Sequence, residues 1–386
     1  MTHSAEADSL FAPARVGSLE LPNRLVMAPM TRNRAEDDGT PPPLMAEYYA
    51  QRASAGLIVT EAAIPAQVGI TTPNVAGIYT ESQVAGWRGI AEAVHAAGGR
   101  IFMQIEHGGR VGHRDNSGLD PIAPSPIALP EGIHTPSGRQ DSPVPIEMTA
   151  EDIRTAVAQF AAAARNGVRA GFSGVEVHAA NGYLLHQFLA DGTNRRTDGY
   201  GGSVANRIRF VVEVVRAVAD AVGAERVGIR ISPGNRVNGI SESDTDVLYP
   251  ALIDAIAPLG MAYVHTVYTE PDAPWFTALR RQWKGTLIAN PVLGRTLPIP
   301  EDGGLSKARR LIEAGADLVS LGRAFLANPD LVERLRIGAP LNPVREEGLE
   351  YTGGPDGYTD YPTLAASEAS PSRSASAAST LGSALR

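Results

Sequence analysis

The chain has 386 residues, of which 43% are hydrophobic, and its formal net charge at pH 7 is -8. This length and apolar content can bury a large core, and a net negative chain without a basic run argues against nucleic acid or an anionic membrane surface as a partner. Because the chain has no cysteine, disulfides, thiolate metal ligands, iron–sulfur clusters and a cysteine nucleophile are excluded.

The sequence shows neither a membrane span nor a secretion signal. No apolar stretch approaches the roughly 18 residues that a span needs. The first ten residues, Met1–Leu10, are polar and acidic and lack the apolar core of a signal peptide. We therefore expect a cytoplasmic protein, monomeric or homodimeric, whose partner is a small molecule and which has no metal site.

Short apolar runs alternate with amphipathic segments along most of the chain. Eight such units predict a (β/α)8 TIM barrel built as a single domain over residues 1–366. A doubly wound open sheet is the weaker alternative, because no Gly-x-Gly-x-x-Gly follows the first strand. The predicted strands are Leu25–Pro29, Leu57–Glu61, Arg100–Glu106, Gly174–His178, Val227–Ser232, Ala262–Val267, Thr286–Asn290 and Leu318–Gly322.

Helical patterns lie between most of these strands. Thr149 followed by Asp152 resembles a capping box, which predicts a helix start at Ala150. The clearest predicted helices are Leu44–Ser54, Glu81–Ala97, Ala150–Ala164, Val204–Val222 and Lys307–Ala314.

Two segments stand outside the repeat. Residues 108–147 are rich in Pro, Gly and Ser and follow the third strand, and a connection of that length predicts a functional excursion or lid. Residues 367–386 form a Ser/Ala-rich tail that we expect to be disordered.

The most informative motif is His178-Ala-Ala-Asn181-Gly-Tyr183, directly behind the apolar run Gly174–Val177. It places three polar groups at the carboxyl end of a predicted strand, where α/β barrels keep their chemistry. His and Asn can donate two hydrogen bonds to one oxygen, and Tyr can supply a proton. Such a site polarises a carbonyl or nitro group and protonates the substrate. The alternative is that the His and Asn only satisfy backbone groups.

Other strand ends add a hydroxyl, a carboxamide and two guanidinium groups to the same pocket. These groups suit a planar polar heterocycle that carries a phosphate. Arg323 follows the eighth strand, a common phosphate position in TIM barrels, and Arg230 points inward from the fifth strand. The alternative for each Arg is an ion pair with an acidic residue of the barrel.

Six stretches together resemble the old yellow enzyme family of FMN-dependent ene-reductases. The resemblance covers Leu10 to about Leu364, in the order and spacing of the family. The matching stretches are Pro22–Arg34, His178–Leu189, Asp198–Arg207, Gly228–Pro233, Leu321–Leu331 and Gly357–Pro362.

The resemblance implies roles for individual residues. Thr31 would bind flavin O4, Arg230 would hold the N1/O2 edge, and Thr instead of Cys at position 31 agrees with the lack of cysteine. His178 and Asn181 would anchor the substrate, Tyr183 would protonate its Cα, and Tyr351 matches an aromatic residue near the substrate mouth. The implied cofactor contacts are Pro29, Met30, Thr31, Ala62, Gln104, Arg230, Gly322 and Arg323, with Gly303–Gly304 or Asn290 as weaker phosphate contacts because this region departs from the usual compact loop.

Two positions depart from the family pattern. Glu106 stands where the family usually has a Trp that shapes the substrate pocket. A carboxylate there either selects a basic or hydroxylated substrate or is a solvated group at the rim, and if buried it must be paired or protonated. His186 replaces an Asp or another acceptor, and we expect a helix histidine with satisfied hydrogen bonds.

The family mechanism predicts that NADPH, or NADH, reduces FMN, and that an enal, enone or nitroalkene then takes hydride from flavin N5 and a proton from Tyr183. One alternative is a flavin-dependent tailoring enzyme (an isomerase, dehydrogenase or cyclase) in which Glu106 acts on a polar substrate. Two others are a flavin- or phenol-binding protein without activity and a phosphate-binding barrel lyase without flavin.

Overall fold

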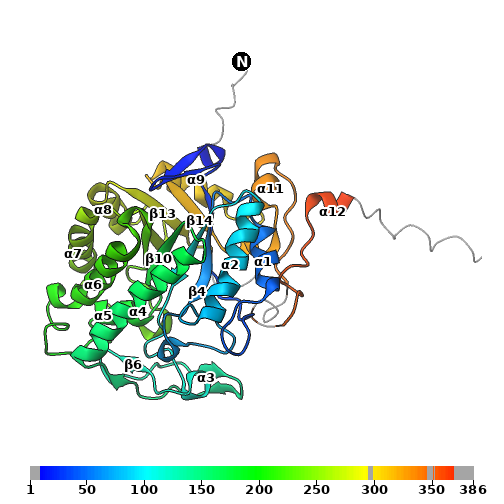
Figure 1. The fold of residues 1–386 in the computed structure, drawn as a ribbon. Helices are drawn as coiled ribbons and strands as arrows, with labels where there is room; N and C mark the ends of the chain where they lie inside the picture. The colour runs from blue at the N-terminus through cyan, green and yellow to red at the C-terminus, as the bar shows by residue number, and fades with distance from the viewer. Residues whose placement is uncertain (1–8, 294–298, 346–350, 352, 369–386) are drawn as a thin grey trace, which may run out of the picture.

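Eight parallel strands close into a barrel, with helices around it (Figure 1). The computed structural model describes residues 9–293, 299–345, 351 and 353–368. Around the barrel the strands follow the order β10-β11-β12-β13-β14-β3-β4-β5, so the predicted (β/α)8 TIM barrel is confirmed. The strands are β3 (Leu25–Met27), β4 (Leu57–Ala63), β5 (Ile101–Ile105), β10 (Gly174–Ala179), β11 (Val227–Ile231), β12 (Tyr263–Thr269), β13 (Thr286–Pro291) and β14 (Leu318–Leu321).

The strands form where the sequence has short runs rich in β-branched and other apolar residues. β4 and β10 are buried at every position, as expected of parallel strands covered on both faces. Each predicted strand overlaps an observed one. β12 runs further than predicted, to Thr269, and its pairing with β13 shifts register after Thr266. Tyr268 lies in this irregular stretch with a positive φ of 53°, a strained conformation for a bulky residue.

The helices differ from the predictions mainly at their ends. The first ends at Ala50 instead of Ser54, and the helix capped by Thr149 and Asp152 continues to Arg169 because Ala163, Ala164 and Gly167 are buried. The helices around the barrel are α1 (Pro43–Ala50), α2 (Glu81–Ala96), α4 (Ala150–Arg169), α5 (Leu184–Leu189), α6 (Val204–Val222), α7 (Thr245–Ile256), α8 (Pro274–Gln282), α9 (Leu305–Glu313), α10 (Arg323–Ala327) and α11 (Leu331–Ile337).

A hairpin closes one end of the barrel and residues 108–147 lie at the other (Figure 1). The hairpin, β1 (Ala14–Val16) and β2 (Leu19–Leu21), buries Val16 and Leu21 against the first residues of the barrel strands. Residues 108–147 contain α3 (Arg114–Ser117), β6 (Ile122–Ala123), β7 (Ile133–Thr135), β8 (Gly138–Gln140) and β9 (Ile146–Glu147). The short 3-10 helices are η1 (Ser9–Phe11), η2 (Gln67–Gly69), η3 (Ala224–Arg226), η4 (Val237–Gly239) and η5 (Ala257–Leu259).

Residues 108–147 are attached to the barrel mouth through Arg110, which is buried. Its guanidinium donates to the carbonyl oxygens of Asn238 and Gly239 at 2.8 and 2.9 Å, and also to two carbonyl groups within the excursion. Of the predicted disordered tail, residues 367 and 368 end the short helix α12 (Leu364–Glu368), and the rest lies outside the described residues.

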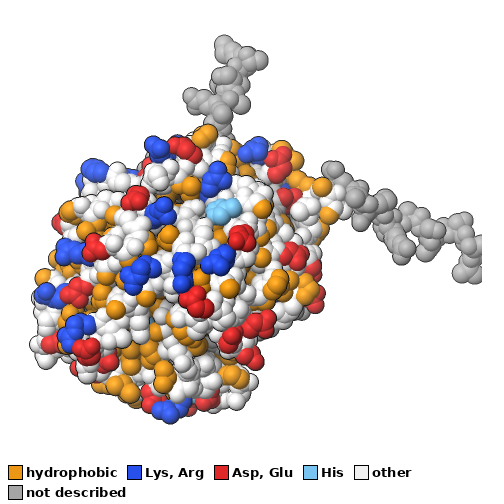
Figure 2. Space-filling model, in the orientation of Figure 1, with side chains coloured by type: hydrophobic (Ala, Val, Ile, Leu, Met, Phe, Trp, Pro, Cys, Tyr) orange, Lys and Arg blue, Asp and Glu red, His pale blue; other side chains and the backbone are white. Residues whose placement is uncertain are grey.

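Acidic and basic side chains are interspersed on the face that Figure 2 shows, so that face carries no extended field of one sign. Within the described ranges, no helix has the length and apolar character needed to cross a bilayer. The same residues contain no group of three or more His, Asp or Glu side chains arranged to hold a metal ion.

Candidate active site

The barrel brings the predicted polar residues together at the carboxyl ends of its strands. β10 lies between β5 and β11, and its His178 is paired in register with Arg230 on β11. On the other side, Glu176 of β10 is paired with Gln104 of β5. Side chains two residues apart on a strand point to the same face, so Glu176 and His178 face the barrel interior together.

His178 is a neutral, buried imidazole. Only 2% of its surface is exposed, and its Nδ1 lies 3.4 Å from Gln104 Nε2. Its Nε2 lies 3.5 Å from Glu106 Oε2. Burial and the positive charge of Arg230 hold the pKa of His178 well below its ordinary value. The ring therefore has one N–H to donate and one nitrogen that accepts.

Asn181 sits in a tight turn that directs its carboxamide. Asn181, with a φ of 56°, and Gly182, with a φ of 79°, are two consecutive residues in the left-handed region. A side chain at position 182 is excluded, because a Cβ there would lie 2.6 Å from Asn238 Cβ. The Asn181 Oδ1 accepts a hydrogen bond from Asn235 Nδ2 at 3.1 Å, and its backbone N–H donates to Ser232 Oγ at 2.9 Å. The amide nitrogen of the side chain is thereby left as the donating end.

Tyr183 follows immediately as the N-cap residue of α5. Its ring centroid is 5.4 Å from that of His178, and it packs against Val111, Leu129 and Ile133 of the excursion. The charge of Glu106 and burial raise the pKa of the Tyr183 hydroxyl well above its ordinary value, while a hydrogen bond with Asn238 opposes the shift. The phenol therefore keeps its proton and can act as an acid.

Glu106 is buried near His178 and Tyr183 and is not solvated at the rim. Its relative exposure is 3%, and burial raises its pKa to about 8, although Arg230 acts in the opposite direction. Near neutral pH the group is therefore mainly a carboxylic acid, which can donate as well as accept a hydrogen bond. Of the two possibilities that the sequence leaves open, the solvated rim carboxylate does not fit the structure.

The raised pKa of Glu106 predicts a pH-dependent stability. Because burial raises the pKa of Glu106 from 4.5 to about 8, the contribution of Glu106 to the free energy of unfolding is fully present below pH 4.5 and is lost as the pH rises through about 8. In Glu106→Gln the fall in the free energy of unfolding that ionisation of Glu106 causes should be absent. We therefore expect its melting temperature to exceed that of the wild type by roughly 5 °C at alkaline pH but not in acid. Scanning calorimetry at about pH 5 and about pH 9 measures the difference.

Glu61 in β4 is a second buried carboxyl group whose pKa is raised, so its effect on this experiment must be considered. Burial raises its pKa to about 7, but it is present in both proteins and cancels in the comparison. Equal melting temperatures of Glu106→Gln and wild type at alkaline pH would contradict a buried, protonated Glu106.

Arg230 fits the flavin edge that the sequence suggests. The side chain is 5% exposed, and its Nε is buried without a hydrogen-bond partner among the described residues. An acceptor from outside the chain, such as the N1/O2 edge of a flavin, would satisfy it. Arg230 also lies close enough to Glu176 for that carboxylate to support its charge. The described residues form no ion pair with Arg230, so the ion-pair alternative is not observed there, and Glu176 acts on its charge only at longer range.

β3 and β14 are neighbours in the barrel, and their carboxyl ends meet. The Ala28 N–H donates to the Leu321 carbonyl at 2.9 Å, and Met30 packs so near Gly322 that a Cβ at position 322 would lie 3.1 Å from its sulfur. Pro29, Met30 and Thr31 follow β3 and are half-buried. On the neighbouring strand Ala62 is buried, and the Glu61 carboxylate accepts the Arg32 N–H at 3.1 Å, which fixes the segment that contains Thr31.

The weaker phosphate contacts are less well placed. Asn290 donates its amide to the Ser320 carbonyl at 2.8 Å. Gly303 and Gly304 have positive φ, but Asp302 accepts the Gly304 and Ser306 N–H groups at the start of α9. A carboxylate already occupies that helix end, so the position is poor for a second anion. The first turn of α10 contains no acidic residue, so Gly322 and Arg323 stay the proposed phosphate contacts.

Tyr351 lies at the mouth of the site and is 50% exposed. The Arg32 guanidinium is 5.2 Å from its ring centroid, and Tyr351 contributes to the raised pKa of Tyr183. The C-terminal segment that carries it is anchored by Tyr358, whose ring stacks on Tyr48 at 4.0 Å. Residues that are distant in sequence thus meet at one rim.

His186 is a buried histidine with satisfied hydrogen bonds, as predicted. Its Nδ1 accepts the Gly182 N–H at 3.0 Å, and its Nε2 lies 3.2 Å from Glu242 Oε1. Tyr249 donates to the same carboxylate oxygen at 2.8 Å. The interaction with Gly182 connects His186 to the turn that holds Asn181.

The structure adds residues that the sequence interpretation missed. Asn235 and Asn238 contact Asn181 and follow β11 closely, so a search past the end of that strand could have found them. Glu176 lies inside an apolar run, and a charged residue in a buried strand is itself a signal of an internal partner.

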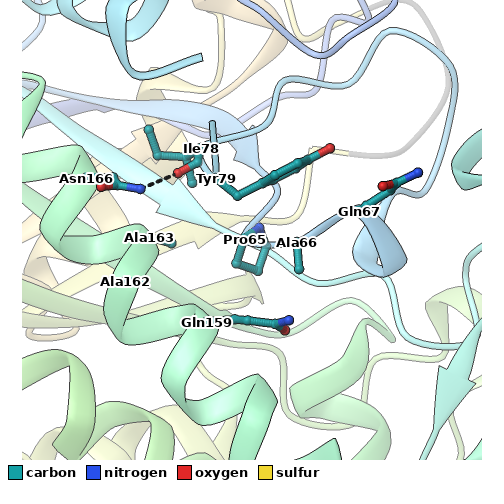
Figure 3. A pocket seen from close by; sticks show the side chains of 9 residues that line it. All are labelled: Pro65, Ala66, Gln67, Ile78, Tyr79, Gln159, Ala162, Ala163 and Asn166. Carbon is teal, nitrogen blue, oxygen red and sulfur yellow. Dashed lines mark hydrogen bonds between the residues drawn. The ribbon is translucent and has the colours of Figure 1, made fainter. Parts of the chain in front are cut away.

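A separate cavity of about 360 Å³ lies outside the barrel mouth (Figure 3). It is lined by the segment after β4 and by α4, and Asn166 of α4 donates to the Ile78 carbonyl at 2.8 Å across it. None of the predicted site residues contributes to its wall.

Comparison with known proteins identifies the family of the chain. Residues 9–342 match the model of the NADH:flavin oxidoreductase / NADH oxidase family. The chain belongs to this family, the old yellow enzymes. A probable flavin mononucleotide-dependent alkene reductase from Leishmania infantum is 42% identical over 94% of this chain and 99% of its own length.

Solved structures of the family superimpose on the whole barrel. The old yellow enzyme homologue from Zymomonas mobilis is 38% identical, with a TM-score of 0.86 over 92% of this chain and 100% of its own. Morphinone reductase in complex with tetrahydroNAD is 42% identical, with a TM-score of 0.85 over 92% of this chain and 98% of its own. This old yellow enzyme is therefore an NAD(P)H-dependent flavin oxidoreductase whose cofactor is FMN.

Proposed function

We propose that this old yellow enzyme uses NADPH, or NADH, to reduce the activated C=C bond of α,β-unsaturated aldehydes, ketones or nitroalkenes. One observation carries the proposal: two hydrogen-bond donors and one acid stand at the same strand end. His178 is neutral, the Asn181 carbonyl oxygen is already occupied by Asn235, and the pKa of Tyr183 is raised.

The two donors act on the electron-withdrawing oxygen of the substrate. The N–H of His178 and the amide of Asn181 bind the carbonyl or nitro oxygen and stabilise the negative charge that grows there. When bound, reduced FMN would supply the hydride that forms the new C–H bond at Cβ. The C=C π electrons then shift to Cα, and Tyr183 transfers its phenolic proton to that carbon. Solvent returns a proton to Tyr183.

The pocket serves the nicotinamide and the substrate in turn. The excursion packs on Tyr183 through Val111, Leu129 and Ile133 and thereby covers one side of the reacting groups. A single covered pocket favours ping-pong kinetics, in which the oxidised nicotinamide leaves before the substrate enters. The polarising groups then act at low dielectric, where hydrogen bonds to a developing charge are strongest.

Stepwise reduction and reoxidation test the proposal. The FMN-loaded protein is reduced without oxygen by one equivalent of NADPH, and 2-cyclohexenone is added while the flavin absorbance is followed. Bleaching and then prompt recovery is the expected result. Failure of NADPH and NADH to bleach the flavin would contradict the proposal. Bleaching without recovery would restrict the substrates to polar compounds that engage Glu106.

Buried Glu106 favours a second candidate function. A carboxylic acid with a pKa of about 8 beside His178 can bind a hydroxyl or amino group of a substrate, or remove a proton from it. In that case the enzyme is a tailoring isomerase, dehydrogenase or cyclase acting on a polar substrate. Measurement of NADPH consumed per product separates the two functions, since an isomerase consumes none.

Replacement of Glu106 by Trp tests its effect on substrate choice. Trp restores the apolar wall usual in the family, so Glu106→Trp is expected to increase kcat/KM for simple enones by about 10-fold. Glu106→Gln, which keeps the polarity and size, is the matched control and should show no such gain. Unchanged kcat/KM across a panel of apolar enones in Glu106→Trp would count against a selective role.

A further inference from the structure

Glu176 is a charged residue in the middle of the barrel interior. It lies on β10 two residues before His178, and its side chain is fully buried. Most barrel interiors are filled by branched apolar side chains, so a carboxylate at this position requires partners. The proposed mechanism gives Glu176 no role of its own.

Its two oxygen atoms are both engaged. Oε1 accepts a hydrogen bond from Gln104 Nε2 at 2.7 Å, and Oε2 lies 2.8 Å from His265 Nδ1. His265 Nε2 is in turn 2.8 Å from Ser320 Oγ. Burial alone would raise the pKa of Glu176, but His265, Arg230 and Gln104 outweigh it and lower the pKa to about 2.

An ionised carboxylate can only accept hydrogen bonds, which dictates how Gln104 is oriented. Gln104 must turn its NH2 group towards Glu176, because the reverse orientation would set its carbonyl oxygen against the carboxylate. The same Nε2 lies 3.4 Å from His178 Nδ1. Since Nε2 is a donor, Nδ1 must accept, and the proton of neutral His178 must reside on Nε2.

This arrangement matters because Glu106 opposes it. A protonated Glu106, 3.5 Å from His178 Nε2, could donate its O–H to that nitrogen and favour the other tautomer. The other tautomer carries its proton on Nδ1 and would have no N–H at Nε2 to offer a substrate. In this chain another interaction must therefore stabilise the tautomer of His178 that carries its proton on Nε2.

We propose that Glu176 is a positioning residue which, through Gln104, keeps the proton of His178 on Nε2. The inference rests on the proposed function, in which His178 Nε2–H binds the substrate oxygen. The Gln104 Oε1 atom makes no hydrogen bond with the described residues, so the same orientation leaves it as an acceptor towards the flavin.

Nitrogen NMR of histidine tests the proposal on the holoenzyme. The chain has eight histidines, so ¹⁵N-histidine labelling gives few signals. The two ring-nitrogen signals of His178 are identified because they are missing from the spectrum of His178→Gln. In the wild type near neutral pH, Nε2 should have the shift of a protonated ring nitrogen and Nδ1 that of an unprotonated one. The reverse pattern in the wild type overturns the proposal without any further variant.

Glu176→Gln then separates positioning from a purely structural role. The amide introduced by Glu176→Gln can donate to the Gln104 carbonyl, so Gln104 can reverse. We therefore expect the Nδ1–H form of His178 to appear and kcat/KM for enones to fall roughly 10-fold. Glu213→Gln, at a half-buried position in contact with Tyr200, is the matched control. It should change neither the tautomer of His178 nor kcat/KM for enones.

If Glu176→Gln fails to fold, Gln104→Met tests the same link, because it keeps the Glu176–His265 pair. An unchanged Nε2–H tautomer in a folded Glu176→Gln, or in Gln104→Met, overturns the proposal. The tautomer is read without turnover. An enzyme that shows the Nε2–H form of His178 but reduces no enone would therefore disprove the proposed function, while the positioning role of Glu176 would stand.

Discussion

Tyr183→Phe is expected to leave reduction of the flavin by NADPH within about twofold of the wild type and to slow reoxidation by an enone at least about 100-fold. The substitution removes only the hydroxyl group. The ring keeps its packing on Val111, Leu129 and Ile133, so binding of the nicotinamide should not change. The two half-reactions are measured separately by stopped-flow absorbance under anaerobic conditions.

Tyr200→Phe is the control for this variant. Tyr200 is also a partly buried tyrosine, but its hydroxyl contacts Glu213 away from the strand ends. Both of its half-reactions should match the wild type. Equal slowing of both half-reactions in Tyr183→Phe would contradict the role of Tyr183 as an acid and would indicate a disturbed pocket.

Asn181→Asp is expected to lower the rate of enone reduction by about 100-fold to 1000-fold, because a donor to a developing negative charge becomes an acceptor that carries charge. Asp tolerates the left-handed backbone of position 181 and can still accept the hydrogen bond from Asn235. The change is therefore confined to the donating end of the side chain. Steady-state kinetics with 2-cyclohexenone measure the loss.

The melting temperature and the FMN content of Asn181→Asp serve as its controls and should remain close to those of the wild type. Flavin reduction by NADPH should also persist. Enone reduction at the wild-type rate in this variant would show that Asn181 does not bind the substrate oxygen.

The alternation of apolar runs and amphipathic segments was sufficient to predict the barrel. Parallel strands buried on both faces need nearly continuous apolar runs, and this pattern is local enough to read from the chain. Helix ends were predicted less well. The helix at Ala150–Arg169 continues past polar Arg165 because its next turns pack against the barrel, and no local signal reports that packing.

The residues of the candidate site could also be named from the sequence, because they directly follow predicted strands. The topology of a closed barrel must bring the strand ends together, and these ends carry His178, Asn181, Tyr183, Gln104 and Arg230. Their individual roles remain proposals, each tied to one of the experiments above.

The sequence by itself determined the barrel, the family and the set of polar groups at the strand ends, since all three depend on patterns along the chain. Only the tertiary structure decided that Glu106 is buried with a raised pKa, that Asn235 orients the Asn181 amide and that Glu176 contacts Gln104. Protonation and hydrogen-bond direction depend on burial and on partners that are distant in sequence, such as Gln104 and Glu176, which are 72 residues apart. These relations arise when the barrel closes, and no local pattern in the chain specifies them.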